Sequence, residues 1–120
     1  MLEFKKYGII FYKKSLAKLK GEKIVLTLNA IREIAIPIAK EYGIAGLYLL
    51  GSYARGDADE NSDLDFRVDR PTGMSLFELG GLQYRLSEAF HCHVDLVTTG
   101  QLSPEFRKAI QNEEVTLYES

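Results

Sequence analysis

The chain has 120 residues, of which 46% are apolar, enough material for one hydrophobic core and too little for two domains. Its net charge is −2, and no stretch reaches the roughly 18 uncharged apolar residues that a membrane span requires. The single cysteine, Cys92, excludes an intramolecular disulfide, and no secretory signal is recognisable, so we expect a cytoplasmic protein.

Positive charge is concentrated in residues 1–23, which carry a net charge of +5, whereas residues 24–120 carry −7. The lysines of this segment are Lys5, Lys6, Lys13, Lys14, Lys18, Lys20 and Lys23. Such a segment can contact RNA, an acidic partner or an anionic surface, or can form a solvated lysine-rich face. Interleaved apolar residues such as Phe4, Tyr7 and Phe11 argue against disorder and leave both a helix and a hairpin open. We interpret residues 1–23 as a basic extension and residues 24–120 as the folded domain.

Residues 27–42 have the apolar spacing of an amphipathic helix, with a stop signal at Gly43. Pro37 lies inside this helix, removes one backbone donor and clashes with the carbonyl four residues earlier, so we expect a kink or a break near residues 35–36. The next run, residues 44–50, is almost wholly apolar and predicts a strand that is covered on both faces. It ends at a glycine-serine pair.

Residues 63–69 alternate strictly between polar and apolar side chains, the pattern of a strand with one buried face. A capping box, Ser75-x-x-Glu78, then predicts the start of a helix. The apolar side of this helix is expected to contain Leu76, Leu79, Leu82, Leu86, Ala89 and Phe90. Within the helix, Gly80-Gly81 costs about 1 kcal/mol per glycine relative to alanine, and the pair would permit close packing against the sheet.

The remaining elements follow in short succession. The sequence predicts a strand at residues 93–98, a helix from Ser103-Pro104 to about residue 111, and an edge strand at residues 115–118. In the strand at 93–98, Val94 and Leu96 should face the core, because alternate side chains of a strand point to opposite faces.

Two aspartates, Asp63 and Asp65, are spaced i, i+2, so both carboxylates lie on one face of the predicted strand. Side-by-side carboxylates repel each other, and a cation between them relieves the repulsion, so the pair predicts a Mg²⁺ site. If the strand at 93–98 lies alongside, Asp95 falls on the same face, together with His93 and Val97. Asp63 and Asp65 would then bind a nucleotide-bound ion. Asp95, helped by Asp63 or Asp65, would hold a second ion that favours deprotonation of the attacking hydroxyl.

Gly51 and Ser52 lie ten residues before this pair and offer a place for a polyphosphate. Glycine lets the backbone approach a phosphate closely, and Ser52 can supply its hydroxyl and its amide. Arg55, one turn further on, can contact the same polyphosphate as a forked cation. Each motif alone is typical of an ordinary turn or a solvated strand face, but their order and spacing together favour a phosphoryl-transfer site.

Residues 91–93 read His-Cys-His, residue types that bind zinc in many proteins. An i, i+2 spacing without a second pair of ligands elsewhere in the sequence is nevertheless a weak metal signal. We expect His93 instead to lie near Asp95 and to influence its environment. Cys92 should face inward, as most single cysteines do. Tyr53, beside the glycine-serine pair, should pack in the core rather than stack on a base.

Gly51-Ser52, ten residues, then Asp63-Leu64-Asp65 resembles the signature of the DNA polymerase β-like nucleotidyltransferase superfamily. The run Gly-Ser-Tyr-Ala-Arg-Gly, with the later His-Val-Asp-Leu-Val at 93–97, is similar to its minimal nucleotidyltransferase branch. The resemblance covers residues 28–118 and implies an α/β (α+β) fold with a small mixed β-sheet and helices packed on one side. It also implies the use of ATP and Mg²⁺. The histidines and cysteine at 91–93 depart from the branch, where a glycine and basic residues are common.

Members of this branch are commonly encoded beside a HEPN-type ribonuclease toxin and act as its antitoxin. The resemblance therefore implies transfer of AMP from ATP to a tyrosine hydroxyl of that toxin, with release of pyrophosphate. A chain of 120 residues has no second domain to hold a small acceptor, so we expect a hetero-oligomer in which the toxin brings the acceptor.

Two other functions stay open. The first is an antitoxin that has lost catalysis and neutralises its partner by binding alone. The second is a nucleotidyltransferase that acts on tRNA or another RNA, for which the basic residues 1–23 would supply contacts.

Overall fold

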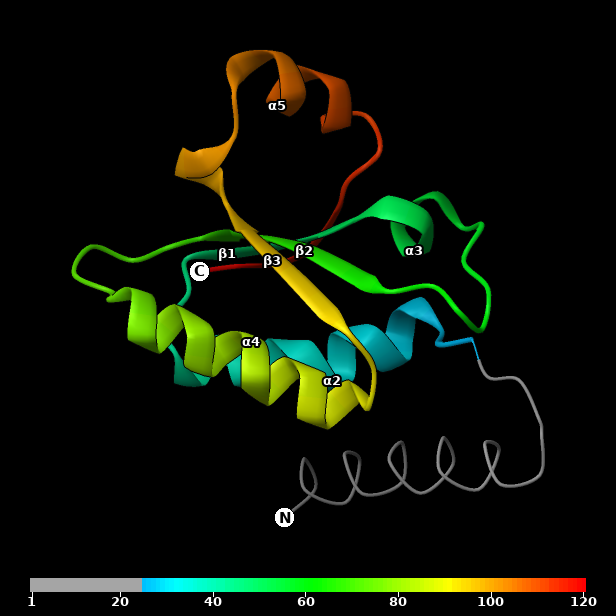
Figure 1. Ribbon diagram of the computed structural model, residues 1–120, viewed down its shortest axis with the longest axis horizontal. Helices are drawn as coiled ribbons and strands as arrows, with labels where there is room; N and C mark the ends of the chain where they lie inside the picture. Colours follow the sequence, from blue (N-terminus) through cyan, green and yellow to red (C-terminus); the bar gives the residue numbers. More distant parts are fainter. Residues whose placement is uncertain (1–24) are drawn as a thin grey trace.

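The centre of the fold is a mixed sheet of four strands (Figure 1). The computed structural model describes residues 25–120. The strands are β1 (Gly46–Leu50), β2 (Leu64–Asp69), β3 (Val94–Thr98) and β4 (Val115–Glu119). Their order in the sheet is β3-β2-β1-β4, with β1 antiparallel to both β2 and β4 and with β2 parallel to β3. The predicted α/β fold with a small mixed sheet is confirmed.

Helices cover one face of this sheet and frame the site on the other. The helices are α2 (Leu28–Glu41), α3 (Gly51–Arg55), α4 (Leu76–Phe90) and α5 (Pro104–Ile110), with a 3-10 helix, η1 (Thr99–Gln101). The two long helices, α2 and α4, lie side by side on one face, as expected (Figure 1). α4 also forms the crossover that parallel strands such as β2 and β3 require. α5 lies on the opposite side of the sheet (Figure 1).

Local signals set the ends of these helices. The capping box of α4 is present: the Glu78 backbone N–H donates to the Ser75 hydroxyl at 3.0 Å, and the Ser75 backbone N–H donates to the Glu78 carboxylate at 3.5 Å. Ser103 caps α5, with Pro104 at the first helical position. Every strand and helix predicted between residues 27 and 118 is found, each with ends close to those expected.

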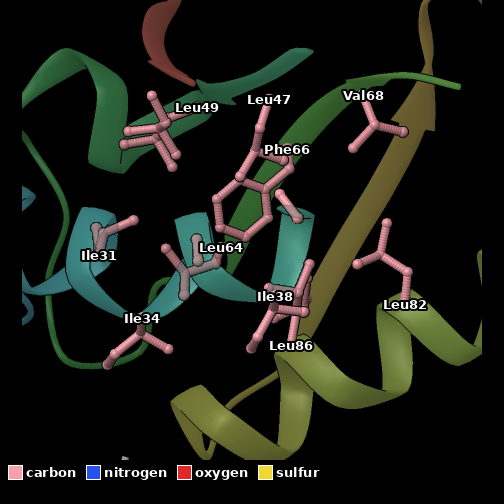
Figure 2. Packing of buried hydrophobic residues seen from close by; sticks show 14 of the residues in the cluster. Ile31, Ile34, Ile38, Leu47, Leu49, Leu64, Phe66, Val68, Leu82 and Leu86 are labelled. Atoms are coloured by element: carbon pink, nitrogen blue, oxygen red, sulfur yellow. The ribbon is translucent and has the colours of Figure 1, made fainter. Parts of the chain in front are cut away.

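The hydrophobic core lies between the sheet and the two long helices (Figure 2). Its largest fully buried side chains in Figure 2 are Ile31, Ile34, Ile38, Leu47, Leu49, Leu64, Phe66, Val68, Leu82 and Leu86. Each such side chain contributes about 1.5–3 kcal/mol by leaving water. Because Leu64, Phe66 and Val68 point into this core, the alternate residues of β2 must face the other side of the sheet. The core therefore orients Asp65 towards the site.

α2 is a single helix through Pro37, so the break expected near residues 35–36 does not occur. Ile34, Ala35, Ile38 and Ala39 are all buried, on both sides of the proline. Packing of these side chains stabilises the helical backbone more than the missing backbone hydrogen bond destabilises it.

Two expectations for α4 were wrong. Leu76 was expected on the buried side but is 73% exposed, beside Phe77 at 90%, because the first turn of α4 projects beyond the strands (Figure 1). The glycine pair does not allow close packing against the sheet either. A Cβ on Gly80 would meet nothing within 4 Å, and one on Gly81 would lie 3.4 Å from the hydroxyl of Tyr42, at the end of α2.

Residues 1–24 lie outside the described part of the chain, so the basic extension and its RNA contacts stay predictions. Within residues 25–120, no helix has the length and apolar character needed to cross a bilayer.

Candidate active site

The turn after β1 is built around Gly51, which opens α3 with a φ of 70°. This left-handed backbone conformation favours glycine. Lack of space also requires glycine here, because a Cβ at this position would lie 2.5 Å from Oδ2 of Asp65. The turn and the first carboxylate of β2 are therefore in contact. α3 ends at Gly56, which is also left-handed, with a φ of 84°.

The acidic residues meet where β2 and β3 run parallel. The register pairs Asp65 with Asp95, and Leu64 with Val94. Asp65 is also opposite Leu50 of β1, the residue before the glycine turn. Asp63 lies one residue before β2, and one carboxylate oxygen of Asp63 lies within 4.8 Å of one of Asp95. The structure thus brings together all three carboxylates that the sequence singled out.

The surroundings of the three acids disfavour ionisation of Asp65. Burial raises the pKa of the half-buried Asp65, and the charge of Asp95, a hydrogen bond with Asp95 and the charge of Asp63 raise it further. The proximity of His93 lowers this pKa in part. Burial and neighbouring negative charge both disfavour the ionised form of Asp65, and a divalent cation, whose preferred ligands are carboxylate oxygens, would offset both.

His93 lies within the same group of side chains. Its Nε2 is 2.9 Å from Oδ1 of Asp95, so the expectation that His93 lies near Asp95 is confirmed. The His-Cys-His run does not form a cluster in residues 25–120. His91 ends α4 in a left-handed conformation, and Cys92 packs against the core. The inward orientation expected for Cys92 is confirmed.

A cavity of about 330 Å³ lies between the open face of the sheet and α5. It is lined by Leu50, Gly51, Arg55, Asp65, Phe66, Asp95, Val97, Phe106, Ile110 and Glu113. Arg55 reaches it from α3 and forms ion pairs with Asp57 at 3.3 Å and with Glu113 at 3.8 Å. Ser52 lies in α3 next to the cavity but is not among its lining residues. Tyr53 packs against the core, as expected.

A buried polar cluster on the open face was not foreseen. Arg67 of β2 is only 4% exposed and donates two hydrogen bonds to Glu114, at 3.0 and 2.8 Å. It also donates to the hydroxyl of Thr99 at 2.7 Å, and its guanidinium lies 3.8 Å from the centre of the Tyr48 ring. Thr99 precedes α5 and Glu114 follows it. Arg67 therefore ties both ends of the α5 segment to the sheet and positions the wall of the cavity.

In this cluster the positive charge of Arg67 lies beside the carboxylates of Asp69 and Glu114. Burial raises the pKa of Asp69, but hydrogen bonds from Thr99 and Tyr48 and the charge of Arg67 lower it on balance. The alternation along residues 63–69 already indicated that Arg67 and Asp69 share the face of Asp65. Their partners lie far away in the sequence and carry no local signal.

Comparisons with known proteins agree with this geometry. The nucleotidyltransferase domain family matches residues 31–117. The chain is 36% identical over 90 residues to "Putative protein adenylyltransferase MJ0435" of Methanocaldococcus jannaschii, covering 75% of this chain and 97% of that protein. It is 34% identical over 95 residues to the protein adenylyltransferase MntA of Thermococcus cleftensis, covering 76% and 96%.

Solved structures share the fold. One, described as a "putative minimal nucleotidyltransferase", has a TM-score of 0.66 and 32% identity over 73% of this chain and 90% of that chain. A chain of the complex between a tri-AMPylated Shewanella oneidensis HEPN toxin and an MNT antitoxin has a TM-score of 0.61 and 19% identity, over 77% of this chain and 72% of that chain.

The fold and the acidic site define a nucleotidyltransferase. The chain belongs to the nucleotidyltransferase domain family and, within it, to the minimal nucleotidyltransferases.

Proposed function

We propose that this protein transfers AMP from ATP to a tyrosine hydroxyl of a HEPN-type ribonuclease toxin and thereby acts as its antitoxin. The observation that carries the proposal is the meeting of Asp63, Asp65 and Asp95 beside the Gly51 turn, at the edge of an open cavity. Support for a protein acceptor comes from relatives named protein adenylyltransferases, which this chain matches over nearly their whole length. The fold shared with an antitoxin bound to an AMPylated HEPN toxin supports the partner.

The three carboxylates fit a divalent metal, for which Mg²⁺ is the proposed ion. Their oxygens form the donor set that Mg²⁺ prefers, and a cation would offset the burial and the neighbouring negative charge that raise the pKa of Asp65. Asp63, Asp65 and Asp95 would hold it. When bound, Mg²⁺ offsets phosphate charge and increases the acidity of the acceptor hydroxyl.

The nucleotide would lie in the cavity with its phosphates at the Gly51 turn. The backbone of Gly51 and the hydroxyl and amide of Ser52 would contact phosphate oxygens, and Arg55 would offset charge on the departing pyrophosphate. The apolar surface of Phe106 and Ile110 on α5 offers a wall for the nucleobase. Phe106 is 50% exposed in the described chain, so its ring is available for such contact.

In the reaction, the tyrosine oxygen forms a bond to the α-phosphorus of ATP, and the bond from that phosphorus to the oxygen bridging the α- and β-phosphorus breaks. Pyrophosphate leaves with that oxygen. The hydroxyl proton passes to the neighbouring carboxylates of Asp65 and Asp95, which are paired across β2 and β3.

Labelled ATP tests the proposal. The full chain is incubated with Mg²⁺, ATP labelled at the α-phosphate and the product of the neighbouring gene. We expect label on a tyrosine of that product, and no label with Asp63→Asn combined with Asp65→Asn. The control variant combines Glu33→Gln with Glu88→Gln, which removes two carboxylates from α2 and α4 on the other face of the sheet.

Three outcomes would contradict the proposal. Unchanged labelling in the double aspartate variant would exclude the acidic site. A tight complex without label transfer would favour the antitoxin that acts by binding alone. Label on RNA in place of protein would favour the RNA-directed enzyme, and loss of that activity on removing residues 1–23 would identify the contact.

A further inference from the structure

His93 lies beside Asp63 and Asp95 in the acidic site, and the sequence motifs gave it no role as a metal ligand. Asp63 and His93 each lie one residue before the paired Leu64 and Val94, which start β2 and β3, and their ligand atoms lie within 4.8 Å of each other. The backbone N–H of Leu64 donates to the carbonyl of His93 at 3.2 Å, which fixes this neighbourhood. The four side chains share the open face of the sheet.

We propose that His93 is a metal ligand, together with Asp63 and Asp95, and that it gives this site a preference for a first-row transition metal such as Mn²⁺ over Mg²⁺. The inference rests on the proposed function, in which Asp63 and Asp95 hold a metal ion. One ligand atom from each of the three residues lies within 4.8 Å of the other two. Ligand atoms that share one ion at about 2.1 Å are roughly 3 to 4 Å apart, so small side-chain rotations suffice.

Exposure makes such rotations possible. The His93 and Asp95 side chains are 60% and 54% exposed, and Nε2 of His93 lies 2.9 Å from Oδ1 of Asp95. Neither is fixed by surrounding core side chains. The imidazole can therefore exchange its contact with Asp95 for a shared cation without disturbing the sheet.

The chemistry of imidazole sets the expected selectivity. Mg²⁺ strongly prefers oxygen ligands, whereas transition metals accept a neutral imidazole nitrogen. A site of three carboxylates alone would suit Mg²⁺. Adding a nitrogen ligand shifts the balance towards Mn²⁺ and its heavier neighbours.

Mn²⁺ is the probe for a direct test. The full chain is loaded with Mn²⁺ without nucleotide, and pulsed electron paramagnetic resonance detects coupling of the metal to a ligand nitrogen. Dissociation constants of Mn²⁺ and, by competition, of Mg²⁺ are measured on the same samples. We expect nitrogen coupling in the natural protein.

Two variants separate ligation from simple positioning of Asp95. His93→Gln keeps a donor that can reach Asp95 but supplies no imidazole nitrogen. It should lose the nitrogen coupling and weaken Mn²⁺ binding at least about tenfold, with a much smaller effect on Mg²⁺. His91→Asn is the control, since His91 is exposed and is not one of the three proposed ligands. Its left-handed φ of 54° is one that asparagine tolerates. It should behave like the natural protein.

The possible failures are distinguishable. If Mn²⁺ binds, and Asp63→Asn with Asp65→Asn abolishes that binding, but no nitrogen coupling is seen or His93→Gln binds Mn²⁺ normally, the ligand role of His93 is overturned while the acidic site stands. If the double aspartate variant binds Mn²⁺ as the natural protein does, the metal site is overturned, and with it both this inference and the proposed function.

Discussion

Gly51 is the residue at which the turn after β1 meets the acidic site. Alanine here would have to adopt a φ of 70° and would place its Cβ 2.5 Å from Oδ2 of Asp65. The backbone cost alone is about 1–2 kcal/mol, and displacement of the Asp65 carboxylate adds to it. We expect Gly51→Ala to lower the free energy of unfolding, measured with urea, and to abolish most AMP transfer.

Gly56→Ala is the matched control for this variant. Gly56 has a φ of 84°, so alanine pays a similar backbone cost, but its Cβ would meet nothing within 4 Å. It should destabilise the protein less than Gly51→Ala and keep most of the activity. Equal losses of activity in the two variants would show that the contact between Gly51 and Asp65 has no role in the site.

Ionisation of Tyr48 is expected to lower the stability of the folded protein at alkaline pH. Burial, together with hydrogen bonds to Asp69 at 2.9 Å and Glu119 at 3.2 Å, raises the pKa of Tyr48 to about 12. In the unfolded chain the pKa of a tyrosine is about 10. Because the folded protein holds the proton more tightly, the stability from this group is complete below about pH 10 and is lost as pH rises through about 12.

Urea unfolding between pH 8 and pH 12 measures this effect. We expect the free energy of unfolding of the natural protein to fall over the upper part of that range, and Tyr48→Phe to show a shallower fall. Tyr118→Phe, on the neighbouring strand β4, should keep the natural slope. An identical slope for Tyr48→Phe and the natural protein would contradict the expectation.

Among the elements, α5 depends on Arg67 for its position. Arg67→Met would leave the partly buried Glu114 without its cation and would remove one hydrogen bond from Thr99, whose hydroxyl still donates to Asp69, at a cost of about 3 kcal/mol. Because the α5 segment then loses its ion pair at Glu114 and one of its hydrogen bonds at Thr99, we also expect a higher KM for ATP. Chemical denaturation and steady-state kinetics measure the two effects.

Arg85→Met is the control for Arg67→Met. Arg85 on α4 makes a similar two-pronged contact with Glu41, at 2.7 and 3.2 Å, but its side chain is 41% exposed and that of Glu41 53%. An exposed pair contributes about 0–1 kcal/mol. If both variants lost equal stability and raised KM equally, Arg67 would have no particular role in placing α5.

The strands, the helices and the three acids could be predicted because their signals are local. Polar and apolar alternation fixed the faces of β2 and β3, and caps fixed the starts of α4 and α5. Adjacent placement of the two strands was a condition for Asp95 to join the site, and the register confirms it.

The position of α5 could not be predicted from the sequence. It depends on Arg67, whose partners Thr99 and Glu114 are 32 and 47 residues away along the chain. Phe106 and Ile110 were therefore missed as cavity residues. The exposure of Leu76 was missed for a related reason, since periodicity shows which side of a helix is apolar but not how far the sheet extends beneath it.

For the whole molecule, we expect residues 24–120 to fold without the basic extension. The hydrophobic core runs from Leu26 to Leu117, and the family match lies within residues 31–117. Relatives such as MntA align over 96% of their length with 76% of this chain. Removal of residues 1–23 should change the melting temperature by less than about 5 °C and leave AMP transfer intact.

Thermal unfolding of the shortened and full chains measures this. The shortened chain changes net charge from −2 to −7, so both are compared at the same moderate salt concentration, where screening reduces the difference. Loss of a cooperative transition would show that residues 1–23 belong to the folded domain rather than extending it.

The crossover between β2 and β3 affects when the enzyme first becomes active in a cell. A nascent chain leaving the ribosome presents Asp63 and Asp65 well before Asp95, because α4 must be made in between. β4 emerges later still and pairs with β1 at the edge of the sheet. The three carboxylates therefore cannot meet before β3 has been synthesised.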